Sequence, residues 1–395
     1  MSEKPSISKT ITSNKTYIML FFVVIIILGI LIYVSNQLNL KNKNCSNLSK
    51  TPNTTVLSIE KTNEFDTNTE LKNYFIKTAY NCCCVGNFKN DYVDACALKN
   101  CAFYGVRALD FQIYSLNNKP IVSASSINSN QYKEIYNYMH FYDTINYVRK
   151  FFIDDGMNSN CKDPLFLIFR LYTINGSVYD MMAQALNQVF GYASPMSNMI
   201  YMLPDNTTLD TTLLSSLMKR VVIIVDPSYG DKTIFANSKL SSFTSMVTGV
   251  SMDNNIYRES SLLGVVAVNR TNGYITDVSN NLCLLYPDLQ PNKNNYDFVT
   301  SGIFNNVSFI AMNFQYTDQF LLEYNKTFFG SCAFIHKQKT LETMCLKTEY
   351  DSTNICRSIK LAQQKANNRP NQDAEDTQDL LNSLNSEGSQ GSEEI

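Results

Sequence analysis

The sequence predicts an α/β barrel of the TIM type that follows an N-terminal transmembrane helix. Two observations indicate the barrel: strand-length apolar runs are continuous rather than alternating, and stretches with helical spacing lie between several of them. A doubly wound parallel sheet is the alternative that the same alternation allows. The apolar runs are 74–76, 106–113, 120–122, 165–171, 221–225, 262–268, 309–314 and 332–335.

Helical spacing is clearest in two stretches between these runs. Apolar residues recur at intervals of three and four at Ile135, Met139, Tyr142, Ile145 and Val148, and again at Met181, Ala185, Leu186 and Val189. Such spacing places one apolar stripe along a helix, which can then pack on a sheet. We therefore expect a helix in each stretch.

The N-terminal element is an uncharged segment of eighteen residues, 17–34. As a helix it would be about 27 Å long at ~1.5 Å per residue, enough to cross the hydrocarbon core of a bilayer. A cleaved signal peptide and a buried helix are the alternatives. The residues after Val34 make a poor cleavage site, which favours a retained single-pass anchor. Three lysines lie on each side of the segment, so they leave its orientation open.

Polar segments bound the folded part. Residues 1–16 form an N-terminal flank, and 35–69, rich in Asn, Thr, Lys and Ser, predict a linker. Residues 366–395 carry seven acids and one arginine and predict a disordered tail, because they cannot bury enough apolar surface. The barrel is then expected over 70–345. A net charge of −2 without a basic run gives no indication of nucleic-acid binding.

In a barrel of this type, the chemistry lies at the C-terminal ends of the strands. The side chains that the predicted strands place there are Tyr80, Asn81, Asp110, Gln112, Ser123, Ala124, Arg170 and Asp226. They are the candidate site residues.

The first half of the chain, 73–226, carries four motifs in a recognisable order. YFIKTAYN at 74–81 is similar to a strand that ends in Ser-Ser-His-Asn, and GVRALDFQ at 105–112 to Gly-Cys-Arg-Cys-Val-Glu-Leu-Asp. PIVSASS at 120–126 is similar to Pro-Ile-Val-Tyr-His-Gly-His, and PLFLIFR at 164–170 to Pro-Val-Ile-Leu-Ser-Leu-Glu. Together these stretches resemble the X half of the catalytic barrel of phosphoinositide-specific phospholipase C.

The second half, 284–337, resembles the Y half of the same family. AMNFQYTD at 311–318 is similar to Ala-Leu-Asn-Phe-Gln-Thr, and GSCAFI at 330–335 to the closing Gly-Cys-Gly-Tyr-Val-Leu strand. LYP at 285–287 and NY at 295–296 resemble the start of that half. The resemblance implies the phospholipase C type of TIM barrel, whose members are phosphoric diester hydrolases of lipid metabolism.

The same resemblance implies two catalytic histidines, one that transfers protons and one that stabilises the charged phosphorane. Their positions are occupied here by Tyr80 and Ala124. Alanine transfers no proton, and a phenol, which ionises only in basic solution, is a poor base at neutral pH. We expect the chain's only histidines, His140 and His336, to be structural or surface residues.

The family's calcium ligands fall on Asn81, Asp110, Gln112 and Arg170. Calcium takes six to eight oxygen ligands, so one carboxylate, two amides and a guanidinium do not suit it. No cofactor is therefore expected. Arg170 would place a cation where the family holds calcium and would pair with Asp110. By the resemblance, calcium-independent bacterial relatives also carry an arginine there, which keeps an active enzyme as an alternative.

Contacts to a substrate phosphate are also expected to be lost. The family's two lysines on the fifth strand fall on Ile224 and Asp226, and its arginine before Tyr-Pro falls on Leu284. A carboxylate at Asp226 would repel a phosphate rather than bind it.

Three adjacent cysteines, 82–84, follow Asn81. Zinc sites need spaced ligands, and a catalytic thiolate needs a basic neighbour, for which only Lys77 is near. Structural cysteines are the third interpretation, with Cys96, Cys101 and Cys161 as candidate disulfide partners. Eleven cysteines favour a barrel on the non-cytosolic side of the membrane.

The sequence therefore predicts a membrane-anchored, phospholipase C-like pseudoenzyme that acts as a binding or structural protein. Its expected partners are the lipid bilayer, through residues 17–34, and other proteins, through the barrel face or the acidic tail. An active calcium-independent phosphatidylinositol phosphodiesterase, with Arg170 and Asp110 as its electrostatic core and Tyr80 as acid, is the main alternative. An inositol-lipid binding module without turnover is the third.

Overall fold

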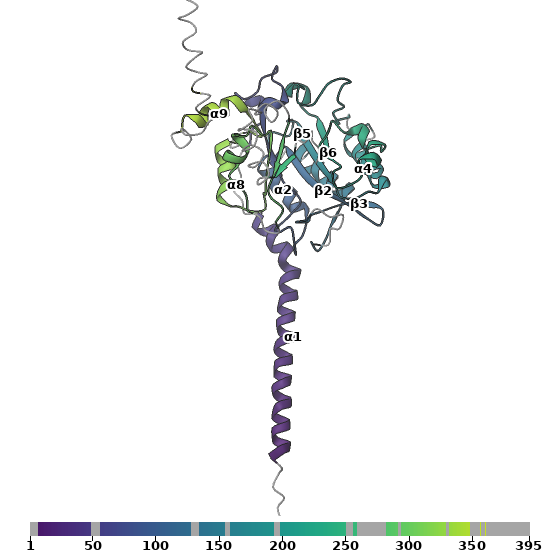
Figure 1. Ribbon diagram of the computed structural model, residues 1–395, viewed down its shortest axis with the longest axis vertical. Helices are drawn as coiled ribbons and strands as arrows, with labels where there is room; N and C mark the ends of the chain where they lie inside the picture. Colours follow the sequence, from purple (N-terminus) through teal and green to yellow (C-terminus); the bar gives the residue numbers. More distant parts are fainter. Residues whose placement is uncertain are drawn as a thin grey trace, which may run out of the picture.

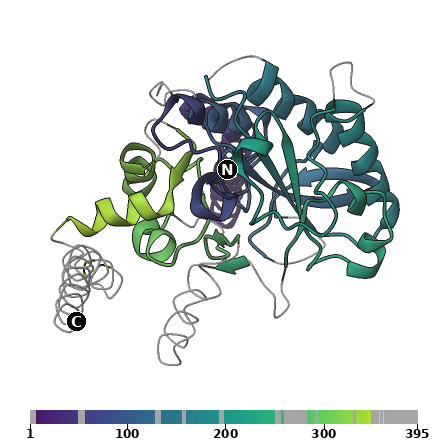
Figure 2. The same cartoon turned by 90° about the horizontal axis from the view of Figure 1, so that it is seen from above.

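The computed structural model describes residues 7–48, 56–127, 134–154, 159–192, 198–249, 256–258, 282–290, 294–328, 332–347, 356 and 360. A single long helix, α1 (Ile7–Leu48), projects from an α/β head (Figure 1). Viewed along that helix, the teal segments of the head lie on one side of it and the yellow-green segments on the other (Figure 2).

The head is built on one eleven-stranded sheet. Eight strands form its main path, each parallel to its neighbours, in the order β7-β6-β5-β2-β1-β10-β9-β8. Their bounds are β1 (Tyr74–Ala79), β2 (Ala108–Leu116), β5 (Leu165–Leu171), β6 (Val221–Asp226), β7 (Met246–Val247), β8 (Ile256–Arg258), β9 (Leu284–Tyr286) and β10 (Phe309–Met312).

Read as a ring in which the last strand, β10, lies beside the first, β1, these strands follow one another in space as they do in the chain. That is the arrangement of a barrel rather than of a doubly wound sheet. Within the described residues no pairing joins β7 to β8, so the sheet is a half-barrel. Every residue of β1, β5 and β6 is buried, as expected for strands covered on both faces. The predicted α/β barrel class is confirmed in this form. The predicted strand at 262–268 lies outside the described residues.

Three further strands are antiparallel additions: β3 (Lys119–Ser123), β4 (Met139–His140) and β11 (Phe334–His336). The prediction that the runs at 120–122 and 332–335 are barrel strands is therefore wrong. β3 follows β2 through Asn117 and Asn118, both with positive φ, and such a two-residue turn joins only antiparallel strands.

The remaining helices cover the sheet. They are α2 (Ala95–Phe103), α3 (Phe141–Arg149), α4 (Gly176–Phe190), α5 (Lys232–Ala236), α8 (Gln319–Glu323) and α9 (Lys337–Cys345). Single turns of 3₁₀ or π-helix are η1 (Ile59–Lys61), η2 (Leu71–Asn73), η3 (Lys150–Asp154), η4 (Leu214–Leu217), η5 (Ser241–Phe243), η6 (Val299–Ile303) and η7 (Tyr324–Phe328). Side chains of Asp94, Asn175, Asp231 and Asp318 cap the first N–H groups of α2, α4, α5 and α8.

The helix predicted over 135–148 begins later than expected. Met139 and His140 pair with Val122 and Ile121 of β3, so their backbone groups are in the sheet, and α3 starts at Phe141. His140, expected within the helix, is its N-cap residue instead. The second predicted helix is α4, and Ala185, Leu186 and Val189 of its predicted stripe lie on the buried face, whereas Met181 is exposed.

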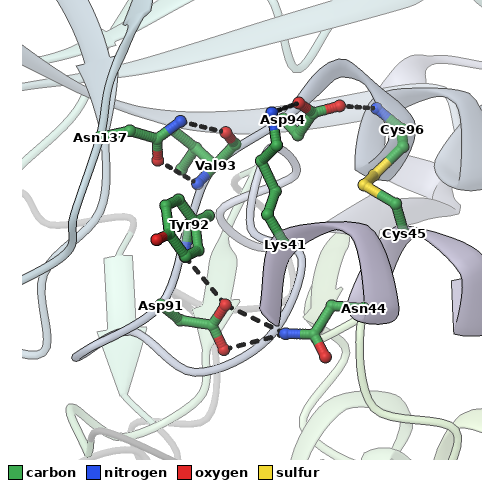
Figure 3. The surroundings of a disulfide bond; sticks show 9 residues. All are labelled: Lys41, Asn44, Cys45, Asp91, Tyr92, Val93, Asp94, Cys96 and Asn137. Atoms are coloured by element: carbon green, nitrogen blue, oxygen red, sulfur yellow. Dashed lines mark hydrogen bonds and ion pairs between the residues drawn. A yellow bond between two sulfur atoms is a disulfide. The ribbon is translucent and has the colours of Figure 1, made fainter. Parts of the chain in front are cut away.

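The predicted linker at 35–69 is largely ordered. Helix α1 continues through the polar stretch to Leu48, and Val56 and Ile59 are buried in the head. Contacts with the head explain the extension, because the last turns of α1 are tied to α2 by a disulfide between Cys45 and Cys96 (Figure 3). The acidic tail predicted over 366–395 lies outside the described residues.

Candidate functional site

The register of the sheet brings the predicted site residues together at one end of the strands. Gln112 of β2 lies opposite Arg170 of β5, which lies opposite Asp226 of β6. Asp110 lies two residues before Gln112 on β2, and Asn81 follows β1 in the left-handed region with φ +41°. All of these residues are at most 3% exposed.

Arg170 is the centre of the cluster. Its Nε and Nη2 donate to the two carboxylate oxygens of Asp110 at 2.8 and 2.7 Å. Nη2 also donates to Asn81 Oδ1 at 2.6 Å, and Nη1 donates to the hydroxyls of Tyr80 and Tyr172 at 3.4 and 3.3 Å. A guanidinium has five N–H donors, so the protein's own oxygens take all of them.

The charge state of this pair is fixed by its surroundings. Burial alone would lower the pKa of Arg170, but the Asp110 carboxylate, with Tyr80 and Tyr172, outweighs burial and raises that pKa. The second oxygen of Asp110 also accepts the backbone N–H of Asn81 at 3.0 Å. The result is a buried, bidentate ion pair whose remaining hydrogen-bonding groups are largely satisfied.

A second arginine, which sequence reasoning missed, lies beside the first. Arg258, the last residue of β8, donates from Nη1 to the Tyr80 hydroxyl at 3.0 Å and to the Pro287 carbonyl at 2.6 Å. The rings of Tyr80 and Tyr286 lie within cation–π distance of both guanidinium groups, at 4.7 and 5.1 Å from Arg170 and 5.5 and 5.3 Å from Arg258. Only a three-residue strand carries Arg258, so no periodic pattern marks it.

Gln112 is engaged with the loop that follows β3. Its Oε1 accepts the Ser125 N–H at 2.7 Å and the Tyr114 hydroxyl at 2.9 Å, and its Nε2 donates to the Ser125 carbonyl at 3.3 Å. Ser123 donates to the Asn137 carbonyl at 3.3 Å, away from Arg170. Ala124 is fully buried. This side of the cluster therefore holds a loop in place.

Asp226 is also buried, and burial raises its pKa against the opposing hydrogen bonds from Ser228. Its Oδ1 accepts the Ser228 N–H at 2.9 Å. A side chain at Gly249, whose φ is +141°, would place its Cβ 2.7 Å from the same oxygen. Ile224 and Leu284, at the family's other phosphate-contact positions, are fully buried apolar residues.

The triple cysteine at 82–84 is a set of buried thiols, and burial raises the pKa of both Cys82 and Cys84 well above the usual value for a thiol. The predicted disulfide partners are wrong. The disulfides join Cys45 to Cys96 and Cys345 to Cys356, which are contacts between elements that the sequence does not place together. Cys101 and Cys161 are free.

Neither histidine reaches the cluster. His140 caps α3, and His336 ends β11, where its backbone N–H donates to Glu64 at 2.9 Å. Among the described residues, one group of potential metal ligands is compact enough to hold an ion, namely Cys45, Asp94 and Cys96. Its two sulfur atoms form a disulfide, which removes them as thiolate ligands.

Comparison with known proteins relates the fold of this chain to solved structures. Neither a family model nor a curated protein matches the sequence. The structure is similar to PLC21 of L. pealei, with a TM-score of 0.51, 14% identity, and coverage of 69% of this chain and 38% of that one. PLC21 of S. officinalis gives a TM-score of 0.50, 13% identity and the same coverage.

A calcium-dependent phosphoinositol-specific phospholipase C of Pseudomonas sp. is also similar, with a TM-score of 0.41, 9% identity, and coverage of 69% of this chain and 98% of that one. The chain spans less than half the length of the two PLC21 chains. At these identities the PLC21 similarity concerns the fold. The head is a phospholipase C-like α/β half-barrel.

Proposed function

We propose that this protein is a membrane-anchored, phospholipase C-like pseudoenzyme that acts as a binding or structural protein. One observation carries the proposal: all five N–H donors of Arg170 are taken by buried oxygens of the protein itself. A phosphodiesterase needs donors directed at the substrate phosphate, and these donors are directed at Asp110, Asn81 and two tyrosines.

The proton-transfer groups support the same proposal. The resemblance places a catalytic histidine at Ala124, which is buried and carries no titratable group. The other falls on Tyr80, whose hydroxyl accepts hydrogen bonds from Arg170 and Arg258. Both guanidinium groups donate to that oxygen, so its lone pairs are engaged and are not free to take a proton from a substrate hydroxyl, as a general base must.

The donor set does not fit calcium. The oxygens of Asn81 and Asp110 are turned to Arg170, and Gln112 Oε1 is turned to Ser125 and Tyr114. Calcium would have to share this space with a guanidinium cation, against electrostatic repulsion. The proposed function therefore involves no calcium and no other cofactor.

Membrane attachment is proposed through α1. It is the one helix among the described residues that is long and apolar enough to cross a bilayer, and none of its apolar stretch is buried by the head. The disulfide from Cys45 to Cys96, which begins eleven residues after the span, suits an oxidising compartment and favours a head on the non-cytosolic side. Proteins that bind the head, or the acidic tail at 366–395, would then be found on the non-cytosolic side of the membrane.

An active, calcium-independent phosphodiesterase is the second candidate, and Arg258 favours it. With Arg170 it brings two cations to one phenol, and Tyr80 could then act as an acid toward a leaving group. The burial of Tyr80, which is 1% exposed, opposes this candidate.

Phosphatidylinositol cleavage by the full-length chain in mixed micelles, with calcium or with chelator, separates the two candidates. We expect no hydrolysis above background under either condition. The matched control is Tyr80→Phe, which removes only the phenolic oxygen. Turnover that disappears in Tyr80→Phe would refute the pseudoenzyme proposal and establish the active alternative.

A further inference from the structure

The junction between α1 and the head contains a cluster of three tyrosines, Tyr33, Tyr92 and Tyr136, here called the tyrosine collar. Burial and the neighbouring Tyr33 side chain raise the pKa of Tyr136, which places the two phenols close together. The rings of Tyr92 and Tyr136 lie 5.2 Å apart, and the Tyr92 hydroxyl donates to the Gln37 carbonyl of α1 at 3.2 Å. The collar therefore joins the end of the apolar helix to two loops of the head.

The positions of Tyr33 and Gln37 along α1 set the depth of the tyrosine collar in the bilayer. Tyr33 lies at the end of the apolar segment 17–34, and Gln37 is four residues, about 6 Å, further along the helix axis. The polar layer on each side of a bilayer is about 5–7 Å thick, from the difference between total and hydrocarbon thickness. If α1 spans the membrane, the groups that touch Tyr33 and Gln37 lie at head-group level.

The two head loops cannot easily leave that level, because α1 holds them. Asn44 donates to both carboxylate oxygens of Asp91 at 3.0 and 3.1 Å, next to Tyr92 (Figure 3). The side-chain amide of Asn137 pairs with both backbone groups of Val93 at 2.8 Å, and the Tyr136 N–H donates to the Asp91 carbonyl at 2.9 Å. The second loop is thus fixed to the first, and the first to the helix.

The chemistry of the collar suits a lipid surface. Tyrosine combines an apolar ring with a polar hydroxyl and is enriched where membrane proteins cross the head-group layer. Tyr33 and Tyr136 are 60% and 45% exposed. Two of the lysines nearby are in ion pairs, Lys41 with Asp94 at 3.3 Å and Lys89 with Glu134 at 3.7 Å, which reduces their attraction to anionic lipid.

We propose that the tyrosine collar seats the head directly on the bilayer that α1 crosses, with Tyr136 in the head-group layer. This inference rests on the membrane anchoring proposed above and adds a second, peripheral contact to it. The same contact turns the C-terminal ends of the parallel strands to the membrane, because the loop that carries Tyr92 follows β1 and Asn81. The partner is a zwitterionic lipid surface.

The chain contains no tryptophan, which allows a direct test by single-tryptophan fluorescence. The full-length protein is reconstituted in phosphatidylcholine nanodiscs whose lipids carry bromine, a quencher, near the head group or deep in the acyl chain. Tyr136→Trp reports on the collar, and Tyr92→Trp replaces it if Tyr136→Trp does not fold. Val24→Trp reports on the span, and Leu346→Trp, which follows α9 at the pole of the head away from α1 (Figure 1), is the control outside the membrane.

We expect Tyr136→Trp to lose much of its emission with shallow bromine and less with deep bromine. Val24→Trp should be quenched more by deep bromine, and Leu346→Trp should keep its emission with both lipids. Quenching of Val24→Trp without quenching of Tyr136→Trp would refute the collar and leave the anchor standing. No quenching of Val24→Trp would refute the anchor and the collar together.

Discussion

Arg170 and the two buried lysines, Lys77 and Lys337, show two ways of placing a cation inside one head. Arg170 faces the Asp110 carboxylate, and its pKa is raised despite burial. Lys77 faces the Tyr104 carbonyl at 2.7 Å, and Lys337 faces the Asn306 carbonyl at 2.8 Å and the Ser308 hydroxyl at 3.0 Å. Burial lowers the pKa of each lysine to about 7.

The difference shows what compensates a buried charge. A carboxylate supplies a full opposite charge, so the Arg170 guanidinium keeps its proton despite burial. A carbonyl supplies only a dipole, so a small rise in pH removes the lysine proton. The candidate site thus contains a cation held by a carboxylate, while Lys77 of β1 and Lys337 of α9 are cations that titrate near neutrality.

Breaking the ion pair should have the largest effect on stability. Asp110→Asn leaves the Arg170 guanidinium buried beside a neutral amide, and we expect a loss of about 3–5 kcal/mol in the free energy of unfolding. Chemical denaturation of the head within the full-length chain in detergent measures the loss.

The double variant Asp110→Asn/Arg170→Met is the control, because it removes both charges and preserves much of the volume. It should be more stable than Asp110→Asn alone. If the two substitutions are instead additive in their cost, Asp110 and Arg170 do not compensate each other as the geometry indicates.

The lysines should make stability depend on pH. Between pH 7 and pH 8.5 both lysines stay protonated in the unfolded chain, where their pKa has its ordinary value of 10.5, whereas the folded chain, with a pKa of about 7 for each, releases these protons. The unfolded state then binds more protons, so the free energy of unfolding rises with pH, by at most about 1.4 kcal/mol per pH unit for each lysine.

Denaturation at several pH values in that window checks this slope. Lys77→Met should reduce it, and Lys77→Met/Lys337→Met should nearly abolish it. An unchanged slope in the double variant would show that other groups, such as the cysteine thiols or His336, produce the pH dependence.

Tyr80→Phe should have the smallest effect on stability. It removes one acceptor from Arg170 and one from Arg258 but retains the ring that packs against both guanidinium groups. We expect a loss of about 1.5–3 kcal/mol, the range for a hydrogen bond to a charged group, which is below that expected for Asp110→Asn. A loss as large as that of Asp110→Asn would mean that the tyrosines, not the carboxylate, dominate the cluster.

Much of the candidate site could be predicted from strand ends alone. Parallel strands in sequential order bring their C-terminal residues together, so Asn81, Asp110, Gln112, Arg170 and Asp226 could be grouped without coordinates. The pairing of Arg170 with Asp110 follows from their places on adjacent strands. Arg258 could not be predicted, because β8 is three residues long and nothing in its sequence marks it as a strand.

The errors in the predicted fold have a common cause. The run at 120–122 reads as a buried strand whether it is parallel or antiparallel, and only the two-asparagine turn before it decides the direction. Met139 fits a helical stripe equally well, and pairing with β3 decides its conformation. An apolar pattern shows that a segment is buried. Which strand or helix that segment packs against depends on the rest of the chain.

The unbroken course of α1 has a mechanical consequence. The helix runs from Ile7 to Leu48 without a change of element, and the disulfide from Cys45 to Cys96 fixes its last turn to α2. Torsion therefore passes from one end to the other: a rotation of the helix about its own axis turns the half-barrel by the same angle. Whatever binds the helix from the side sets the direction in which the head faces.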